Sequence, residues 1–211
     1  MTVANRRTLT RGALWAAPVL LASATIPAYA ASQLGTAKTT AGKYYHMVST
    51  TTPSGCNVST NPQYGYIDTL PYRSQAGNSN ANRDPNTSSG YWVEGTAGTV
   101  NNVTIVTTYT FNRAIQLDTS STRWGANIIP SGWTVTQVDS STIRVTYTAT
   151  TWNVSTTVVG SGDATGFFLN FHVTDGCYRS RTVTISSTTV MTYFDANGKQ
   201  TFTKNTGPSG I

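Results

Sequence analysis

Apolar and polar residues alternate along three stretches of the chain. Val103–Phe111, Ile143–Tyr147 and Phe167–Val173 place apolar side chains at odd positions, and polar side chains fill most of the even ones. A period of two buries one face of a strand and leaves the other in water, which is typical of antiparallel sheets over a single core. These three stretches therefore predict antiparallel strands.

Other strand candidates lie between clusters of turn residues. They are Lys43–Thr50, Tyr64–Leu70, Tyr91–Val93, Trp133–Val138, Val190–Phe194 and Gln200–Thr203. Asp139–Ser141 and Asp195–Gly198 have the composition of hairpin turns. With about ten strands and no helical period after the N-terminal segment, the pattern predicts an all-β fold, an antiparallel β-sandwich of Greek-key, Ig-like architecture. A closed barrel is the alternative.

Two places interrupt this regular pattern. After Ala149 the apolar positions change from odd to even, at Trp152 and Val154, so we expect either a β-bulge near Thr150–Thr151 or a new strand. Ser74–Gly90 is almost entirely small and polar. Loops longer than about 12–15 residues are uncommon in compact domains, and they are usually functional or disordered.

The N-terminus has the three parts of a secretory signal peptide. Arg6, Arg7 and Arg11 precede an apolar run, and Ala28-Tyr29-Ala30 forms a small-x-small exit. We expect residues 1–30 to be removed, leaving Ala31 as the first residue. The paired arginines indicate the twin-arginine export route. The apolar run of about 14 residues is too short to span a bilayer, so we expect no stable membrane insertion after cleavage.

The remaining chain divides into a short lead-in and one domain. Residues 31–42 are small and polar and are expected to be a flexible lead-in, and residues 43–211 a single β-sandwich domain. Cys56 and Cys177 are the two cysteines of the sequence. In an exported domain they predict one disulfide, which would stabilise the fold by ~4–5 kcal/mol in the chain-entropy treatment.

The charge of the exported chain is small. The formal net charge is +6, but Arg6, Arg7 and Arg11 lie in the signal segment, so 11 basic and 8 acidic residues remain. They are scattered, with no basic run, and we expect no nucleic-acid partner.

No catalytic set, metal site or cofactor is predicted. His46 and His172 are the two histidines, and no Gly-x-Ser-x-Gly motif accompanies them. Glu94 is the single glutamate, and nothing selects a second carboxylate to face it. Asp195–Gly198 begins like a calcium loop, but Thr206 stands where that loop needs glutamate. A secreted hydrolase built on His172 or Glu94 is a remote alternative.

Two surface features suggest binding. Exposed aromatic rings beside polar loops can hold sugar rings, and the tentative binding residues are Tyr72, Arg73, Arg83, Tyr91, Trp92 and Trp124, with Trp152 as a further ring. Packing in the core is the competing interpretation for each ring. Thr-x-Thr pairs occur at Thr134/Thr136, Thr146/Thr148, Thr182/Thr184 and Thr201/Thr203. They resemble ice-binding β-solenoids, but they lack a fixed repeat and Arg144 interrupts them, which favours an ordinary solvated sheet.

The signal segment, from Arg6-Arg7 to Ala28-Tyr29-Ala30-Ala31-Ser32, resembles that of small exported proteins of high-GC Gram-positive bacteria. The rest is similar in pattern to bacterial cell-surface Ig-like sandwiches. The resemblance implies an extracellular protein, released or held non-covalently at the cell wall.

We therefore expect a secreted, non-enzymatic β-sandwich that acts as a cell-surface or extracellular interaction or structural module. Its partner would be a cell-envelope glycan or another surface protein. The alternative is a carbohydrate-binding module that uses exposed Trp and Tyr rings.

Overall fold

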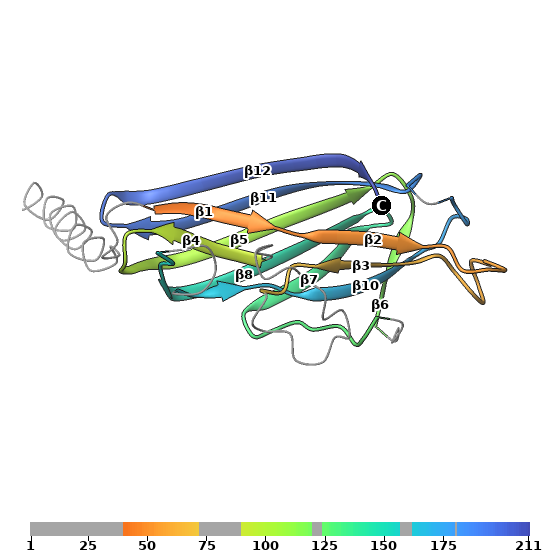
Figure 1. Cartoon of the computed structure of the whole chain (residues 1–211), viewed down its shortest axis with the longest axis horizontal. Coiled ribbons are helices and arrows are strands. Elements are labelled where there is room, and N and C mark those ends of the chain that lie inside the picture. Colours follow the sequence, from red (N-terminus) through yellow and green to blue (C-terminus); the bar gives the residue numbers. More distant parts are fainter. Residues whose placement is uncertain (1–39, 72–89, 120–123, 157–161, 180) are drawn as a thin grey trace, which may run out of the picture. The chain divides into compact units, whose positions relative to one another are not determined.

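The protein is an all-β fold (Figure 1). The structure, a computed structural model, describes residues 40–71, 90–119, 124–156, 162–179 and 181–211. Within these ranges every strand pairing is antiparallel and no helix is present. The described strands are β1 (Thr40–Tyr45), β2 (Met47–Thr51), β3 (Tyr64–Asp68), β4 (Gly90–Gly95), β5 (Thr99–Phe111), β6 (Ile115–Asp118), β7 (Trp133–Asp139), β8 (Thr142–Asn153), β9 (Ala164–Thr165), β10 (Phe168–Val173), β11 (Thr184–Asp195) and β12 (Gly198–Gly210). The expected fold class is confirmed, with twelve strands in these ranges rather than about ten.

One layer of the fold is a five-stranded sheet with the order β12-β11-β5-β8-β7. The other layer consists of two short sheets placed end to end, β1-β4-β9 and β2-β3-β10-β6. His46 alone separates β1 from β2. Tyr45 at the end of β1 pairs with Gly90, and Met47 at the start of β2 pairs with Asp68. β4 and β3 therefore lie beside the consecutive strands β1 and β2, as two halves of one interrupted strand.

The chain passes repeatedly between the two layers. The connections β4–β5, β5–β6, β6–β7, β8–β9 and β10–β11 each join a strand of one layer to a strand of the other. Such crossings are typical of Greek-key sandwiches. Within the described ranges no pairing between named strands joins the five-stranded sheet to the other layer, although a parallel bridge links Glu94 of β4 to Ser155, just past β8. The sandwich is therefore favoured over the closed barrel.

The core lies between the layers and contains the predicted inward residues. Val103, Ile105, Tyr109 and Phe111 of β5 are buried, and Phe171 of β10 packs against Phe111 with ring centroids 4.9 Å apart. The alternating pattern therefore identified the core face of these strands correctly.

The second face of β10 is buried as well, which alternation alone did not predict. Phe168 exchanges backbone hydrogen bonds of 2.8 and 2.9 Å with Ile128, and its ring stacks on Tyr66 at 5.7 Å. The segment before β7 therefore covers the outer side of β10, and Phe168 and Asn170 are both almost fully buried.

Both predicted hairpins are present. Asp139 lies at the end of β7, where its carboxylate accepts a hydrogen bond from the Ser141 backbone amide at 2.7 Å. Asp195 pairs with Gly198, and its carboxylate accepts from the Asn197 amide at 2.8 Å. Each aspartate stabilises its turn by satisfying a backbone donor two residues later.

The predicted irregularity near Thr150 is shared by two strands. β8 continues to Asn153 without a break, and Val103 pairs with Ala149 while Asn101 pairs with Thr151. In both β5 and β8, the side chains that face the core therefore change between odd and even positions at the same level of the sheet. Asn102 has a φ of 50°, and the pairing of β5 with β11 shifts at the same level. β5 therefore has a β-bulge relative to β11, whereas its register with β8 continues unchanged across this level.

The two ends of the described domain differ from the prediction. β1 begins at Thr40, so Thr40–Gly42 of the expected lead-in are in a strand. β12 extends to Gly210, well beyond the expected Thr203. The expected signal peptide, with Ala28, Ala30 and Ala31, lies outside the described residues.

Candidate functional site

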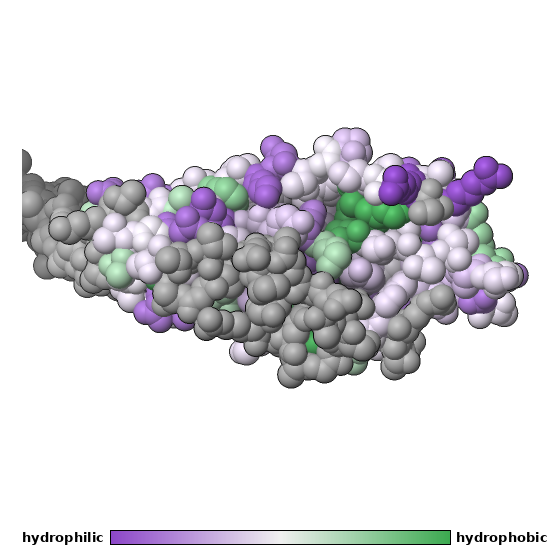
Figure 2. All heavy atoms as spheres, viewed as in Figure 1, coloured by the Kyte–Doolittle hydropathy of each residue, from purple (hydrophilic) through white to green (hydrophobic). Residues whose placement is uncertain are grey.

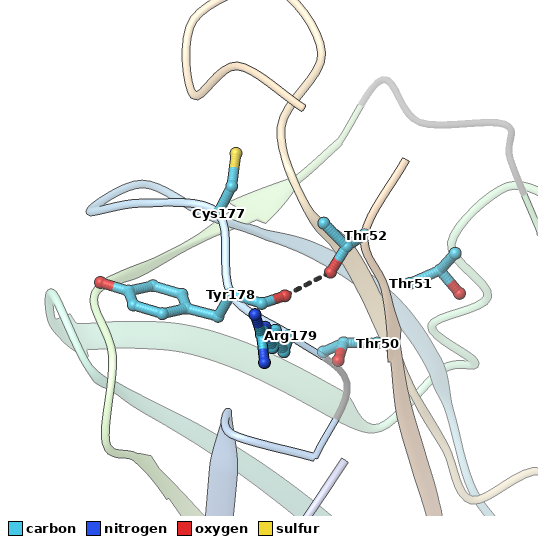
Figure 3. A pocket seen from close by; sticks show the side chains of 6 residues that line it. All are labelled: Thr50, Thr51, Thr52, Cys177, Tyr178 and Arg179. Atoms are coloured by element: carbon cyan, nitrogen blue, oxygen red, sulfur yellow. Dashed lines mark hydrogen bonds between the residues drawn. The ribbon is translucent and has the colours of Figure 1, made fainter. Parts of the chain in front are cut away.

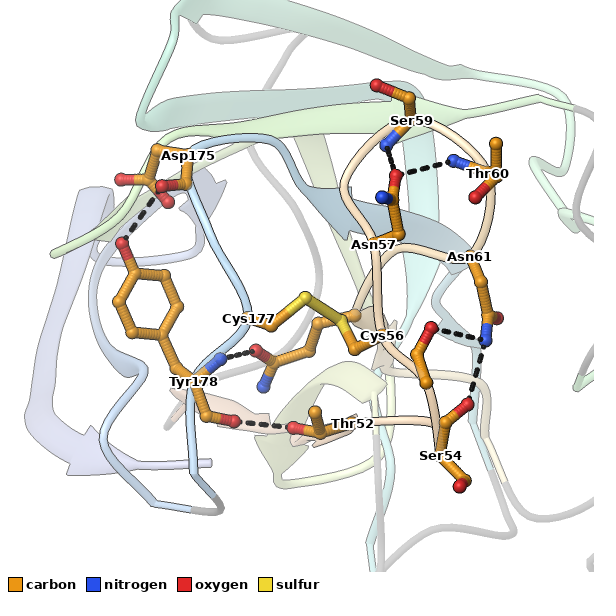
Figure 4. Close-up of a disulfide and its surroundings, with 12 residues drawn as sticks. Thr52, Ser54, Cys56, Asn57, Ser59, Thr60, Asn61, Asp175, Cys177 and Tyr178 are labelled. Carbon is orange, nitrogen blue, oxygen red and sulfur yellow. Dashed lines mark hydrogen bonds between the residues drawn. A yellow bond between two sulfur atoms is a disulfide. The ribbon is translucent and has the colours of Figure 1, made fainter.

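The predicted disulfide between Cys56 and Cys177 is present, with 6.0 Å between the two Cα atoms. It joins the loop after β2 to the segment after β10, as Figure 4 shows. Around it, the Thr52 hydroxyl donates to Tyr178 O at 2.5 Å, and the Tyr178 amide donates to Gln63 Oε1 at 2.9 Å. The bridge and these hydrogen bonds together hold the end of the first layer.

An open hollow of about 610 Å³ lies beside the bridge (Figure 3). Its lining consists of Thr50, Thr51, Thr52, Cys177, Tyr178 and Arg179. The cysteine is oxidised, and no carboxylate or histidine belongs to the lining. Among the described residues, the lining therefore offers threonine hydroxyls but no carboxylate or histidine that could act as their base.

His172 does not form a catalytic triad. Its Nδ1 lies 3.8 Å from Asp118 Oδ2, too far for a hydrogen bond. Asp175, which lies three residues after His172 in the sequence, instead accepts a hydrogen bond from the Ala114 amide at 3.0 Å. No serine hydroxyl is bonded to His172 in the described part of the chain. The geometry that a serine hydrolase requires is not assembled there.

Glu94 is held by two cationic or donor groups rather than by a second acid. Trp92 Nε1 donates to Glu94 Oε2 at 3.3 Å, and Lys43 Nζ lies 4.0 Å from Oε1. A glycosidase pair needs two carboxyl groups that face each other across a cleft. Glu94 has the environment of an ordinary strand residue in an ion pair.

His46 belongs to a polar network that runs into the core. The Tyr44 hydroxyl bonds to His46 Nδ1 and, at 2.7 Å, to the Tyr109 hydroxyl. Burial lowers the pKa of His46 to about 4, and the charge of Lys204 acts in the same direction. His46 is therefore neutral at physiological pH and acts as a hydrogen-bonding partner.

The network continues through hydroxyl groups on three strands. Tyr91 bonds to Thr107 at 2.9 Å, and Thr107 bonds to Thr189 at 2.8 Å. Burial raises the pKa of Tyr44 to about 12 and raises the pKa values of Tyr91 and Tyr109 as well. A satisfied buried network of this kind fixes the packing of the two layers.

Most of the aromatic rings considered for sugar binding are buried. Tyr91 is fully buried, Trp92 is 6% exposed and Trp152 is 2% exposed. Tyr91 and Trp152 pack in the core between the layers, whereas Trp92 lies on the opposite face of β4, where its Nε1 donates to Glu94 Oε2. Little of any of the three rings is exposed. Trp124 is half-buried, and its ring meets Tyr66 edge-on at 5.3 Å. Tyr72, Arg73 and Arg83 lie outside the described residues.

The side of the molecule in Figure 2 shows mixed polarity. One small hydrophobic area lies near the C-terminus marked in Figure 1, among polar residues. The large apolar side chains that are exposed are Tyr45 and Met47, which flank His46 between β1 and β2, and Val58, Ile129 and Val138 in other segments. Single exposed apolar residues are normal on soluble proteins, and they do not mark an interface.

The outer face of the five-stranded sheet is a continuous surface rich in threonine. We call it the threonine face. It consists of Thr134, Thr136, Arg144, Thr146, Thr148, Thr104, Val106, Thr108, Thr188, Val190, Thr192, Thr201, Thr203 and Asn205. Each of these residues is exposed or half-buried. Three of the four Thr-x-Thr pairs predicted from the sequence are on this one face.

The strand register arranges these side chains in rows across the sheet. One row is Thr201–Thr192–Thr104–Thr148, the next is Thr203–Val190–Val106–Thr146–Thr134, and the third is Asn205–Thr188–Thr108–Arg144–Thr136. Neighbouring side chains in a row are about 4.5–5.5 Å apart at Cβ. The sequence shows the pairs along each strand, but the rows depend on a cross-strand register that only the fold supplies.

A second hollow, of about 280 Å³, lies between β5 and β8 at the level of the β5 bulge. Asn102, Val103, Thr104, Thr148, Ala149 and Thr150 line it. Thr104 and Thr148 also belong to the threonine face, so this hollow opens beside one of its rows. The change of apolar parity after Ala149 was the sequence signal for it.

Two features are absent from the described residues. No group of three or more histidine, cysteine or acidic side chains there could hold a metal ion. No helix in the same ranges is long and apolar enough to cross a membrane. In comparisons with family models, with curated proteins and with solved structures, no match to this chain was found.

Proposed function

We propose that this protein is a secreted, non-enzymatic β-sandwich that acts as an interaction module at the cell surface or in the extracellular space. The threonine face is its contact surface. The observation that carries the proposal is the set of rows across five strands, which form a broad, hydroxyl-rich and largely uncharged surface.

Threonine suits such a surface for a physical reason. Its side chain is β-branched and short, so its χ1 angle is already restricted by the strand. Ordering it against a partner therefore costs less conformational entropy than ordering lysine or glutamate. Each threonine also presents a methyl group and a hydroxyl group side by side, which supports both apolar contact and hydrogen bonding.

The twist of the sheet favours a flexible partner over a planar one. Adjacent strands in a sheet rotate by about 20–25°, so five strands turn through roughly 80–100°. A planar lattice such as ice would touch a limited part of such a face. A polymer chain can follow the twist, and a cell-envelope glycan is therefore the preferred partner over a crystalline surface.

Export is supported by two independent features. The arginine pair and the small-x-small exit of the N-terminus form a secretory signal. The disulfide is the second feature, because such bridges persist in oxidising compartments outside the cytoplasm.

Sedimentation with isolated bacterial cell walls tests the proposal. The protein is expected to co-sediment with walls both before and after their proteins are removed by protease. The double variant Thr108→Glu/Thr146→Glu places two carboxylates in the middle of the threonine face, and we expect its retention to fall at least tenfold. The matched control, Ser59→Glu/Thr60→Glu, changes exposed residues of the loop after β2.

Full retention of the threonine-face variant would rule out this surface. Loss of retention after protease treatment would identify a protein partner instead of a glycan. A protein that sediments with neither preparation would contradict the proposal.

A further inference from the structure

Arg144 lies on β8 in the third row of the threonine face, between Thr108 and Thr136. It is exposed, and in the described part of the chain no hydrogen bond or ion pair involves its guanidinium. Its direct neighbours across the sheet are Thr108 on β5 and Thr136 on β7. A free guanidinium is therefore surrounded by hydroxyl groups.

The charge of this face is one-sided. None of its fourteen residues is acidic, and Arg144 is the charged member. Lys199, exposed at the start of β12, adds a second cation next to the face. Asp139, exposed at the end of β7, pairs with Thr142 and so lies just beyond the row of Arg144. The face itself has a cation and no acid among its residues, which favours anionic partners over cationic ones.

The row beyond Thr192 places an aromatic ring near the second hollow. Phe194 pairs with Lys199 on one side and with Asn101 on the other. Phe194 is half-buried and is not part of the hydrophobic core between the layers. An apolar ring, the Asn102 amide and the hydroxyls of Thr104 and Thr148 thus gather at one end of the face.

The second hollow and Arg144 lie along the same strand. Thr148, in the lining of the hollow, is four residues from Arg144 on β8. At about 3.3 Å per residue, the two points are ~13 Å apart. One extended ligand can reach both, whereas a single small molecule in the hollow cannot.

We propose that the threonine face binds an anionic polysaccharide. One sugar unit occupies the hollow at Asn102, Thr104 and Thr148, and a carboxylate or phosphate group of the same chain pairs with Arg144. This proposal deepens the proposed function and rests on it. Guanidinium binds both anions through two parallel hydrogen bonds, and the surrounding threonine hydroxyls supply further donors.

A peptide partner fits the observations less well. Peptide and protein contacts concentrate their binding energy in large aromatic anchors that fill apolar pockets. The lining of the second hollow is mainly amide and hydroxyl, and at about 280 Å³ it is smaller than the roughly 300–1,000 Å³ of a typical drug-sized site. Its size and chemistry suit one polar ring.

Binding to matched polymers tests the charge requirement. Polygalacturonate and its methyl ester share one backbone and differ in charge, and a glycerol-phosphate teichoic acid provides the phosphate arm. By affinity electrophoresis at low salt, the protein is expected to bind polygalacturonate or the teichoic acid at least tenfold more tightly than the ester. Whichever of polygalacturonate and the teichoic acid binds more tightly relative to the ester shows whether the recognised anion is a carboxylate or a phosphate.

Three variants assign the effect to residues. Arg144→Gln should remove the preference for the anionic polymers while leaving weaker binding to the ester. Asn102→Gly keeps a residue that accepts the positive φ, and it should weaken binding to all polymers alike. Arg179→Gln, an exposed arginine of the first hollow, is the control and should change nothing. Thermal melting checks that each variant is folded.

Equal binding of the wild-type protein to the charged polymers and to the ester would overturn this inference, as would an Arg144→Gln variant that keeps the preference. If cell-wall retention through the threonine face persists in that case, the proposed function stands without it. If no polymer binds and the face variant still sediments with walls, both fail.

Discussion

The side chain of Gln137 on β7 hydrogen-bonds to the backbone of Ile115 on β6 and so joins the two layers. Gln137 Nε2 donates to Ile115 O at 2.7 Å, and Gln137 Oε1 accepts from the Leu117 amide at 3.0 Å. β6 and β7 are the outer strands of different sheets, so one amide group satisfies backbone atoms that no neighbouring strand reaches. Trp133 Nε1 of β7 also bonds to the other layer, donating to Thr165 Oγ1 of β9 at 2.9 Å.

The variant Gln137→Leu should destabilise the fold. It leaves the Ile115 carbonyl and the Leu117 amide without partners, and each unpaired buried group costs about 1–3 kcal/mol. We expect the free energy of unfolding in urea to fall by ~2–3 kcal/mol. Gln116→Leu is the matched control, because Gln116 is exposed on β6, between the two residues that Gln137 contacts. Equal stability of the two variants would show that the junction of β6 and β7 does not depend on Gln137.

His46 should make the fold less stable in mild acid. Its pKa is about 4 in the folded protein, because of burial and then Lys204, against about 6.5 in the unfolded chain. Between these values the unfolded chain binds the proton and the folded protein does not. Stability contributed by neutral His46 is therefore present above pH 6.5 and is lost as the pH falls to about 4, by ~2–3 kcal/mol.

The variant His46→Gln isolates this contribution from that of the carboxylates. Urea unfolding of both proteins at pH 7, 5.5 and 4 gives the difference in stability at each pH. That difference should shift in favour of the variant as the pH falls. A constant difference over this range would mean that His46 is not buried as described.

The buried tyrosines should resist ionisation at alkaline pH. Burial raises the pKa of Tyr44 to about 12 and raises that of Tyr109, whereas Tyr45 is 49% exposed. In an ultraviolet titration, Tyr44 and Tyr109 should ionise only well above pH 10, as the protein unfolds. Stability should accordingly fall as the pH rises above 10.

Removing one hydroxyl from this network tests it separately. Tyr109→Phe keeps the ring and removes the bond to Tyr44, and we expect a loss of ~1–2 kcal/mol of unfolding free energy. Tyr45→Phe is the exposed control. A single titration step for all tyrosines near pH 10, in protein that is still folded, would contradict the burial of Tyr44 and Tyr109.

Replacing both Cys56 and Cys177 by serine should lower the melting temperature substantially. The bridge spans 121 residues, and closing a loop of that length stabilises the fold by ~4–5 kcal/mol in the chain-entropy treatment. For a domain of this size that corresponds to roughly 8–20 °C. The measurement is thermal unfolding by circular dichroism, and an unchanged melting temperature would show that the bridge adds no stability.

The strands with the strongest alternation could be predicted from the sequence, and those held by distant contacts could not. β5 and β8 have apolar residues at every second position, and the hairpin at Asp139 has a recognisable turn. The second half of β12, from Lys204 to Gly210, contains two glycines and a proline and has the composition of a loop. It is a strand because β11 supplies partners on both sides of a register shift at Gly207–Pro208.

The candidate site was predicted in its parts and not as a surface. The Thr-x-Thr pairs are visible in the sequence, but Arg144 looks like an interruption there. The register places Thr108 and Thr136 beside it, which makes it the centre of a hydroxyl-rich area. Composition also cannot tell which rings will be covered, and Tyr91, one of the aromatic candidates, is fully buried.

The interrupted strand formed by β3 and β4 has a consequence for the evolution of this fold. Asp68 and Gly90 lie almost at the same level of their shared neighbour, since they pair with Met47 and Tyr45. The sequence that joins them therefore starts and ends at nearly the same level of the sheet. Its length does not affect the register of the surrounding strands. The scaffold can therefore accept grafted or lengthened segments at this point while its core stays intact.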